Sequence, residues 1–376
     1  MPISVAFITI SSIHQYPFGT SLRNILGEDF NLIFTHPESK DRVRMGRLSS
    51  SLEEPWILRT WESEEAVRKM RECINTCDVV IYGSVPTDLV RDRIQSGKLT
   101  FRYSERLFKK GFLLGFPWWL RRLVRDFWPL NLPNHHLLCN GAYCAGDLRR
   151  VRMFNGRMWK WGYFIEVPSA APPPARREGA VRLLWAGRMI DCKRLDLVLK
   201  AAGRLRASSP PFMVDMIGDG LERNRLVALR EKLGLQNVVR FLTFMPVEQV
   251  KDAMRQADIY VMSSNYLEGW GAVINEAMAA GCCVVSSTGP GAAPWLIDHG
   301  RTGYLFPSGN LDGLCKVLAS LIDNPMQCRA IGQAAWEKMH SRWSPEVAAE
   351  RFIQLASGLL GRGVPPDYPD GPCSRA

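Results

Sequence analysis

The chain has 376 residues, of which 46% are hydrophobic and 23% charged, a composition typical of globular proteins and unlike that of disordered ones. Its length is long for one core and suits two domains of ordinary size. The formal net charge is +11, and no apolar run approaches the roughly 18 residues that a membrane-spanning helix requires.

The first half of the chain alternates strand-like and helix-like segments. Its opening segment, MPISVAFITI, has neither the basic start nor the small-residue cleavage site of a signal peptide, and we expect it to form the first strand. Apolar runs predict strands at 3–10, 30–36, 78–84 and 135–141. Helical spacing of apolar residues predicts helices at 64–77 and 87–97. The pattern predicts an N-terminal α/β domain over residues 1–165.

Most of the excess positive charge lies in residues 101–160, which hold twelve basic and three acidic residues. Aromatic residues are interleaved with these charges, and the segment 105–127 is expected to form one or two amphipathic helices broken at Pro117. Basic and aromatic residues together suit an anionic membrane, which predicts peripheral contact through residues 101–128. An anionic polymer or a nucleic acid would also fit this pattern, although we expect no nucleic-acid partner. The same residues could instead form an ordinary solvated basic face over a helix core.

The second half begins after the segment EVPSAAPPPARREG, residues 166–179, whose proline, alanine and glycine content is typical of an interdomain linker. Strands are expected at 181–187, 212–218, 238–244, 258–264 and 282–287, and helices at 193–205, 221–234, 247–257, 268–281 and 294–298. Strands that are each followed by a helix predict a parallel sheet covered on both faces. We therefore expect a second α/β domain over 166–340. Over 341–376 we expect a helix that returns to the N-terminal domain, followed by a loose tail.

The stretch EGWGAVINEAMAAG, which begins at Glu268, places a carboxylate on each side of a Gly-rich turn. Glu268 directly follows a predicted strand, at the edge where open parallel sheets bind ligands. Gly269 and Gly271 lack the Cβ that would hold a ligand away from the backbone amides. The helix that follows offers free N–H groups to an anion, and Glu276 in its first turns can accept hydrogen bonds from hydroxyls. Phosphate at the amides with hydroxyls at the acids predicts a nucleotide-sugar site.

A second stretch of the same domain, AGRMIDCKRLD, supplies the positive charge that such a ligand needs. Arg188 comes immediately after a predicted strand, and Lys193 opens the next helix. A guanidinium and an ammonium at these positions are expected to neutralise a diphosphate from two sides.

Residues 181–306 resemble the C-terminal domain of GT-B fold glycosyltransferases, specifically the large retaining family 4. The matching elements come in the family's order: GRMIDCKRLDLVLKAAGRL, MIGDGLERNRL, VVRFLTFMPVEQV, ADIYVMSSNYLEGWGAVINEAMAAGCCVVSS and GRTGYLF. The stretch 148–167 resembles the interdomain segment of a bacterial polysaccharide-assembly branch. The resemblance implies an α/β GT-B fold with two Rossmann-like doubly wound parallel-sheet domains facing across a cleft.

The resemblance also implies an activity: transfer of a sugar from a UDP- or GDP-linked donor to a glycan or lipid-linked acceptor in surface polysaccharide biosynthesis, with retention at the anomeric carbon. Arg188 and Lys193 would bind the diphosphate, Glu268 the transferred sugar and Glu276 the ribose. No metal or other cofactor is expected, because the two cations do the charge work. The implied donor-binding residues are Arg188, Lys193, Gly218, Met245, Glu268, Gly269, Trp270, Gly271, Ala272, Val273 and Glu276.

Two departures from the family pattern affect the catalytic assignment. The family often keeps a histidine in the N-terminal domain, where this chain reads IYGSVP; His14, His135 and His136 are each expected to be structural. Glu105, after a predicted strand, is the candidate acceptor-side group, which gives Glu268, Arg188, Lys193 and Glu105 as the catalytic set. Where the family often has Gly-x-x-Pro-Glu, this chain has Trp295 in place of the acid, which suggests stacking on the donor sugar.

Other classes of function fit the sequence less well. A dinucleotide-binding oxidoreductase would need G-x-G-x-x-G after the first strand, and ITISSIHQYPFG lacks it. A catalytically inactive GT-B scaffold and a non-transferring GT-B enzyme such as a sugar-nucleotide epimerase remain as alternatives. The ten cysteines include no CxxC pair and are expected to be buried free thiols in a reducing compartment. A cytoplasmic location, peripheral at the inner face of the plasma membrane, is expected.

Overall fold

The computed structural model describes residues 3–12, 14–38, 54–113, 115–168 and 179–376. The chain divides into two compact units, one made of Met1–Glu166 with Arg342–Ala376 and the other of Val167–Ser341. Most of the expected linker lies outside the described residues.

The first unit is built on a seven-stranded parallel sheet in the order β3-β2-β1-β4-β5-β6-β7. Its strands are β1 (Val5–Thr9), β2 (Phe30–Phe34), β3 (Leu58–Arg59), β4 (Val79–Tyr82), β5 (Thr100–Ser104), β6 (His135–Asn140) and β7 (Met158–Trp161). Its helices are α1 (Tyr16–Leu26), α3 (Glu64–Thr76), α4 (Arg91–Gln95), α5 (Phe116–Arg122), α6 (Ala142–Arg150) and α14 (Pro345–Leu359). Short helical turns span Gly27–Asp29, Thr87–Val90, Leu123–Phe127 and Trp128–Leu130.

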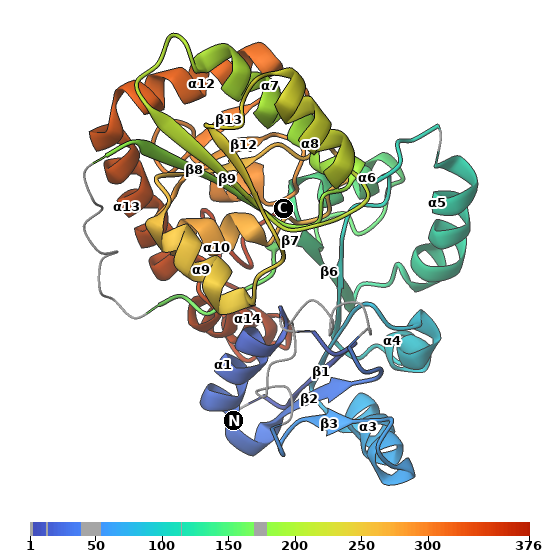
Figure 1. Ribbon diagram of the computed structural model, residues 1–376. Helices are drawn as coiled ribbons and strands as arrows, with labels where there is room; N and C mark the ends of the chain where they lie inside the picture. The colour runs from blue at the N-terminus through green and yellow to red at the C-terminus, as the bar shows by residue number, and fades with distance from the viewer. Residues whose placement is uncertain (1–2, 13, 39–53, 114, 169–178) are drawn as a thin grey trace. The chain divides into compact units, whose positions relative to one another are not determined.

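The two faces of this sheet are covered by different helices (Figure 1). Alternate residues of β1 point to opposite faces, as the pleat requires. Ala6 and Ile8 belong to the cluster formed with α3 and α4, whereas the ring of Phe7 packs edge-on against Phe18 of α1. Phe352 of α14 in turn packs against Phe18, so the C-terminal helix completes the core of the first unit.

The end of the chain differs from the loose tail that the sequence predicted. The N–H of Cys373 donates to the carbonyl of Lys160, and the N–H of Ala376 donates to that of Met158, so the tail pairs with the open edge of β7. Cys373 is fully buried. The prediction was wrong because proline and glycine indicate loops but do not show where backbone donors find partners.

The segment 105–127 also differs in detail from its prediction. Pro117 lies in the first turn of α5 instead of breaking a helix, because a residue there has no intrahelical partner for its N–H and proline costs little. The helix continues as a turn of π-helix over Leu123–Phe127. Within the residues that the structure describes, no helix has both the length and the hydrophobicity that crossing a membrane requires.

The second unit is built on a six-stranded parallel sheet in the order β10-β9-β8-β11-β12-β13. Its strands are β8 (Val181–Ala186), β9 (Phe212–Ile217), β10 (Val239–Leu242), β11 (Ile259–Met262), β12 (Cys283–Ser287) and β13 (Tyr304–Phe306). Its helices are α7 (Leu195–Leu205), α8 (Arg223–Lys232), α9 (Val247–Gln256), α10 (Val273–Ala279), α11 (Ala293–Leu296), α12 (Leu311–Asp323) and α13 (Pro325–Arg342), with a 3-10 turn at Asp191–Lys193. The α/β class and the doubly wound parallel sheets of both units are confirmed.

Candidate functional site

The order of the strands in the second unit fixes where a ligand site is expected. From β8 the chain moves outward through β9 to β10, and then returns to β11 on the other side of β8. In open parallel sheets, ligands bind beyond the carboxyl ends of the strands at such a reversal of direction. The segment after the carboxyl end of β8 carries Arg188 and Lys193. The segment after the carboxyl end of β11 carries Glu268.

Lys193 and Glu268 meet at this edge, although 75 positions separate them in the sequence. The ammonium of Lys193 donates to Glu268 Oε2, and each side chain is only 16% exposed. The loops are joined at two further points: Ser263 Oγ donates to the carbonyl of Lys193 over 2.7 Å, and the N–H of Asn265 donates to the carbonyl of Cys192 over 2.8 Å. A largely buried ion pair is therefore flanked by two hydrogen bonds that join its loops.

Arg188 has a fixed backbone and an exposed side chain. The N–H of Met189 donates to the carbonyl of Asp219 over 2.8 Å, which joins this loop to the GDG turn after β9. A Cβ at position 218 would lie 1.9 Å from the carbonyl oxygen of Gly187, and the φ of Gly218, +134°, also favours glycine. Only glycine at this position therefore lets the two loops lie so close together. No carboxylate of the described residues pairs with Arg188, which leaves its guanidinium available to an anion.

The Gly-rich turn between β11 and α10 is held in place by contacts with the segment after β12. Gly271 has a φ of +86°, and a Cβ there would lie 3.1 Å from Pro290 Cβ and 3.2 Å from Met262 Cε. The carbonyls of Gly269 and Trp270 accept hydrogen bonds of 2.8 and 2.9 Å from the segment after β12. The turn is thus held in one conformation beside the Lys193–Glu268 pair.

The residues around this turn are not equally accessible. Trp270 is 1% exposed, and its indole N–H donates to Asn275 Oδ1 over 2.8 Å, so only its backbone is available to a ligand. Ala272 and Val273 at the start of α10 are partly exposed, as is Glu276 in its first turn. Sequence reasoning could not assign a direction to Trp270, because a loop has no periodicity that would indicate which side chains face inward.

Tyr260, in the middle of β11, is a residue of this site that the sequence analysis missed. Its hydroxyl donates to the carbonyl of Ala186 over 3.0 Å at the end of β8. Burial raises the pKa of Tyr260, and the negative charges of Glu276 and Glu268 raise it further. Both acids therefore lie near the hydroxyl of Tyr260. A hydroxyl-bearing residue inside an otherwise apolar strand was the available signal.

The remaining predicted residues lie apart from this pair. Met245 follows β10, the edge strand, and is partly buried. Glu105 belongs to the first unit, where it pairs with Lys109 over 3.3 Å and accepts a 3.4 Å hydrogen bond from the hydroxyl of Tyr163. The rings of Trp295 and Trp270 lie 6.3 Å apart, so Trp295 packs beside the Gly-rich turn.

Two of the three candidate histidines are buried. His135 bonds to Tyr82 and to the carbonyl of Leu130, and burial lowers its pKa to about 3. His136 accepts a 3.2 Å hydrogen bond from the indole N–H of Trp159. His14 stacks on the ring of Tyr163. All ten cysteines are free thiols, and among the described residues no three His, Cys, Asp or Glu side chains gather as a metal site would require.

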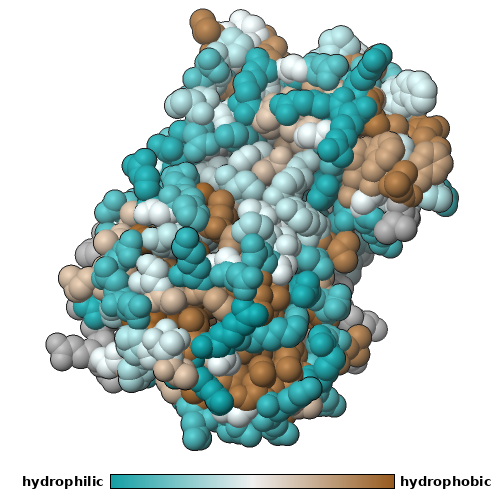
Figure 2. Space-filling view, turned by 90° about the horizontal axis from the view of Figure 1, so that it is seen from above, coloured by the Kyte–Doolittle hydropathy of each residue, from teal (hydrophilic) through white to brown (hydrophobic). Residues whose placement is uncertain are grey.

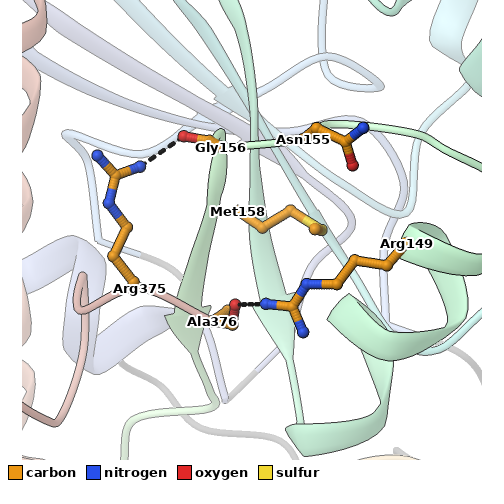
Figure 3. A pocket seen from close by; sticks show the side chains of 6 residues that line it. All are labelled: Arg149, Asn155, Gly156, Met158, Arg375 and Ala376. Atoms are coloured by element: carbon orange, nitrogen blue, oxygen red, sulfur yellow. Dashed lines mark hydrogen bonds between the residues drawn. The ribbon is translucent and has the colours of Figure 1, made fainter.

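The structure also holds a hollow of about 220 Å³ in the first unit, where the end of the chain pairs with β7 (Figure 3). The guanidinium of Arg149 there donates to the carbonyl of Ala376, and that of Arg375 to the carbonyl of Gly156. Both cations therefore act as links between main-chain segments. The hollow is lined by Arg149, Asn155, Gly156, Met158, Arg375 and Ala376.

Comparison with known proteins finds one family model that matches the second unit. Residues 170–338 match the model of the family described as glycosyl transferases group 1. Among curated relatives, an amylovoran biosynthesis glycosyltransferase of Erwinia amylovora is 28% identical over 185 residues, which are 48% of this chain and 45% of that protein. A lipopolysaccharide core biosynthesis glycosyltransferase of Rhizobium meliloti is 28% identical over 192 residues, 51% of each chain. The chain thus spans about half the length of these relatives.

Similarity to solved structures extends over both units. The structure of Anabaena HepE in complex with UDP superposes with a TM-score of 0.70 at 14% identity, and the alignment covers 96% of this chain and 100% of that one. At this identity the likeness concerns the fold. The two Rossmann-like parallel-sheet units are those of the GT-B fold, as the sequence predicted.

Proposed function

We propose, from the match of residues 170–338 to group 1 glycosyl transferases, that this chain is a retaining glycosyltransferase of family 4. It would transfer a sugar from a UDP- or GDP-linked donor to a glycan or lipid-linked acceptor in surface polysaccharide assembly, at the inner face of the membrane. The observation that carries the proposal is the contact between Lys193 and Glu268 at the reversal point of the second sheet. The names of the relatives support the class of acceptor.

The arrangement suits a donor whose leaving group is a nucleoside diphosphate. Departure of the diphosphate concentrates negative charge on its oxygens, and cations fixed beforehand at that place lower the barrier. The ammonium of Lys193 has three donors, so it can keep its bond to Glu268 while it donates to phosphate. Arg188, which pairs with no carboxylate of the described residues, adds a second cation, so the proposal needs no metal.

The two acids have a different task in this proposal. An ionised carboxylate is an acceptor only, and Glu268 and Glu276 would receive hydrogen bonds from the hydroxyls of the transferred sugar and of the ribose. The backbone amides at Gly269–Gly271 and at the start of α10 would contact phosphate or sugar oxygens, with Gly218 and Met245 near the base. Glu105 remains the proposed acceptor-side group.

Nucleotides are expected to stabilise the second unit. A ligand at a hundred times its dissociation constant adds about 2.7 kcal/mol, which for a unit of this size raises the melting temperature by about 5 to 10 °C. Thermal-shift measurements with UDP, GDP and their sugars would identify the base, with NAD as the control for a dinucleotide-binding enzyme. Stabilisation by NAD alone, or the same shift in Lys193→Ala as in the wild type, would contradict the proposed site.

Turnover separates an enzyme from a binding scaffold. Purified protein should hydrolyse its preferred nucleotide-sugar slowly in the absence of an acceptor, with release of the nucleoside diphosphate. A scaffold would bind the nucleotide without releasing product, and an epimerase would return an isomerised nucleotide-sugar.

We propose in addition that residues 101–128 contact an anionic membrane surface. Several large apolar side chains are exposed there, and Leu113 and Trp128 are 83% and 67% exposed. The positive charges of Arg121 and Arg125 are also exposed beside them. On the face seen in Figure 2, an apolar patch bordered by hydrophilic residues lies on the right, the side on which α5 lies in Figure 1. Apolar side chains next to cations suit anionic lipids.

Replacing Leu113 and Trp128 together by serine is expected to weaken binding to vesicles of phosphatidylglycerol and phosphatidylcholine by about a hundredfold or more, because each apolar side chain contributes about 1.5–3 kcal/mol when fully buried. Flotation of the protein with vesicles measures the effect. The matched control is the double change Leu221→Ser with Val364→Ser, which removes two side chains that are 94% and 90% exposed elsewhere. Equal loss in both variants would show that α5 has no special role.

A further inference from the structure

We propose that the first unit binds a phosphate group of a lipid-linked acceptor between the guanidinium of Arg122, the side-chain amide of Asn140 and the N-terminus of α6. The phosphate site follows from the first unit alone; its assignment to the acceptor rests on the proposed function.

Asn140, the last residue of β6, is the first observation. It is 3% exposed, and neither its Oδ1 nor its Nδ2 has a hydrogen-bond partner in the described part of the chain. The hydroxyl of Tyr163 lies near Asn140 but donates to Glu105 Oε1 over 3.4 Å, and burial raises the pKa of Tyr163 well above its usual value. A buried amide left without partners costs about 1–3 kcal/mol, so a position that keeps one is a place where a polar ligand is expected.

The helix that follows Asn140 is the second observation. α6 begins at Ala142 after Gly141, whose φ of +104° turns the chain sharply from strand to helix. No side chain caps this end, and no acidic residue occupies its first turn. Uncapped N–H groups and the positive end of the helix dipole favour a bound oxyanion.

Arg122, at the end of α5, supplies the charge. Its guanidinium donates to Ser104 Oγ over 3.0 Å, and among the described residues no carboxylate lies within ion-pair distance. Burial lowers its pKa, and repulsion from Arg102 lowers it further. A partly buried cation without a carboxylate partner is unfavourable, and an anionic ligand would reduce that cost.

Ser104 connects these groups at the carboxyl edge of the sheet. In the pairing of β5 with β6, Ser104 lies opposite Cys139, the residue before Asn140. The thiol of Cys144, in the first turn of α6, donates to the carbonyl of Ser104 over 3.2 Å, while the hydroxyl of Ser104 receives the bond from Arg122. The Arg122 guanidinium, the end of β6 and the start of α6 are therefore neighbours.

The acids near this place are already engaged. Glu105 pairs with Lys109 over 3.3 Å, and Asp126 pairs with Arg125 over 2.7 Å. Both contribute to the electrostatic environment of Arg122, but neither binds it. In the described part of the chain, Arg102 and Arg122 therefore form no ion pair with a carboxylate, and their charges remain available to a phosphate.

The lipid part of the proposal comes from α5 itself. The guanidinium of Arg122 lies under the ring of Trp118, 5.5 Å from its centroid, and Trp118 is 49% exposed. Phe116 and Leu120 on the same helix are 48% and 36% exposed. An apolar surface thus continues directly to a partly buried cation, as a phosphate with an attached hydrocarbon chain requires.

The test uses phosphatidylcholine vesicles doped with a polyprenyl diphosphate, compared with vesicles doped with the uncharged polyprenol. Wild-type protein should bind the diphosphate vesicles more tightly. Arg122→Gln and Asn140→Leu should each weaken this binding by about ten- to a hundredfold, the effect of one or two charge-assisted hydrogen bonds. Arg121→Gln removes an equal charge from an exposed neighbouring position and sets the size of the non-specific loss.

Thermal stability distinguishes a binding role from a structural one. Asn140→Leu removes two unsatisfied polar atoms, so its melting temperature should equal or exceed that of the wild type while its binding falls. If Asn140→Leu and Arg122→Gln bind diphosphate vesicles as well as Arg121→Gln does, the proposal is overturned. If soluble pyrophosphate distinguishes wild type from both variants as strongly as the vesicles do, the site takes a free anion and the lipid part is wrong.

Failure of this inference and failure of the proposed function give different results. Nucleotide binding by the second unit and hydrolysis of a nucleotide-sugar involve none of the residues changed here. Loss of vesicle binding with intact hydrolysis supports the phosphate site. Absence of any hydrolysis with the same vesicle result contradicts the transferase and leaves the site in place.

Discussion

Replacing Arg188 by alanine is expected to reduce kcat/KM for the nucleotide-sugar by about thirty- to a thousandfold, or about 2–4 kcal/mol of transition-state stabilisation. Its guanidinium is exposed at the end of β8 and has no carboxylate partner among the described residues, so its charge is available to the leaving diphosphate. For the same reason, the loss of this side chain should change the free energy of unfolding by less than about 0.5 kcal/mol, and the melting temperature should stay nearly the same.

The matched control for this prediction is Arg182→Ala. Arg182 is also exposed, but it lies near the amino end of β8, whereas Arg188 follows the carboxyl end. If the ligand lies beyond the carboxyl end of β8, only the Arg188 variant should lose activity. Equal losses would point to the overall charge of the unit, and an unchanged Arg188→Ala would remove the diphosphate site from this edge of the sheet.

The second unit could be predicted well because its sequence pattern and its topology agree. Apolar runs that alternate with helical spacing determine a parallel sheet, and a parallel sheet brings all carboxyl ends to one edge. Lys193 and Glu268 are therefore brought together by a rule that requires no knowledge of side-chain packing. The rule predicts which edge of the sheet holds the site but not how individual side chains are oriented. The side chain of Trp270 is buried, and Tyr260 reaches the end of β8 from within β11.

The first unit was less predictable for a physical reason. Its strand β7 and its tail depend on contacts between segments more than two hundred residues apart, such as those of Lys160 with Cys373 and Ser374. Local spacing carries no signal for such pairs. Asn140 is a sharper case, because an asparagine at a strand end usually indicates a turn, and only the structure reveals that its amide lacks partners.

Replacing Arg93 by methionine is expected to lower the free energy of unfolding of the first unit by about 3–5 kcal/mol, the cost of breaking a buried charged network. Arg93 is 2% exposed, and its guanidinium donates to the carbonyls of Ile74, Asp78 and Leu99 over 2.6 to 3.0 Å. Burial lowers its pKa to about 10, which leaves it charged at neutral pH. Methionine fills a similar volume but removes the donor to all three carbonyls, and among the described residues only that of Leu99 keeps another, the N–H of Val80 at 3.3 Å.

Denaturant unfolding followed by tryptophan fluorescence measures this effect, with hydrogen exchange over residues 74–99 as the local readout. Arg93→Lys should recover only part of the stability, because one ammonium cannot span acceptors that a planar guanidinium reaches from separate nitrogens. The control is Arg91→Ala, two residues away, which breaks only a surface pair with Asp88 and should cost less than about 1 kcal/mol. If Arg93→Met unfolds at the same denaturant concentration as Arg91→Ala, the carbonyls of Ile74, Asp78 and Leu99 find other donors. In that case the hydrogen bonds of Arg93 do not stabilise the first unit.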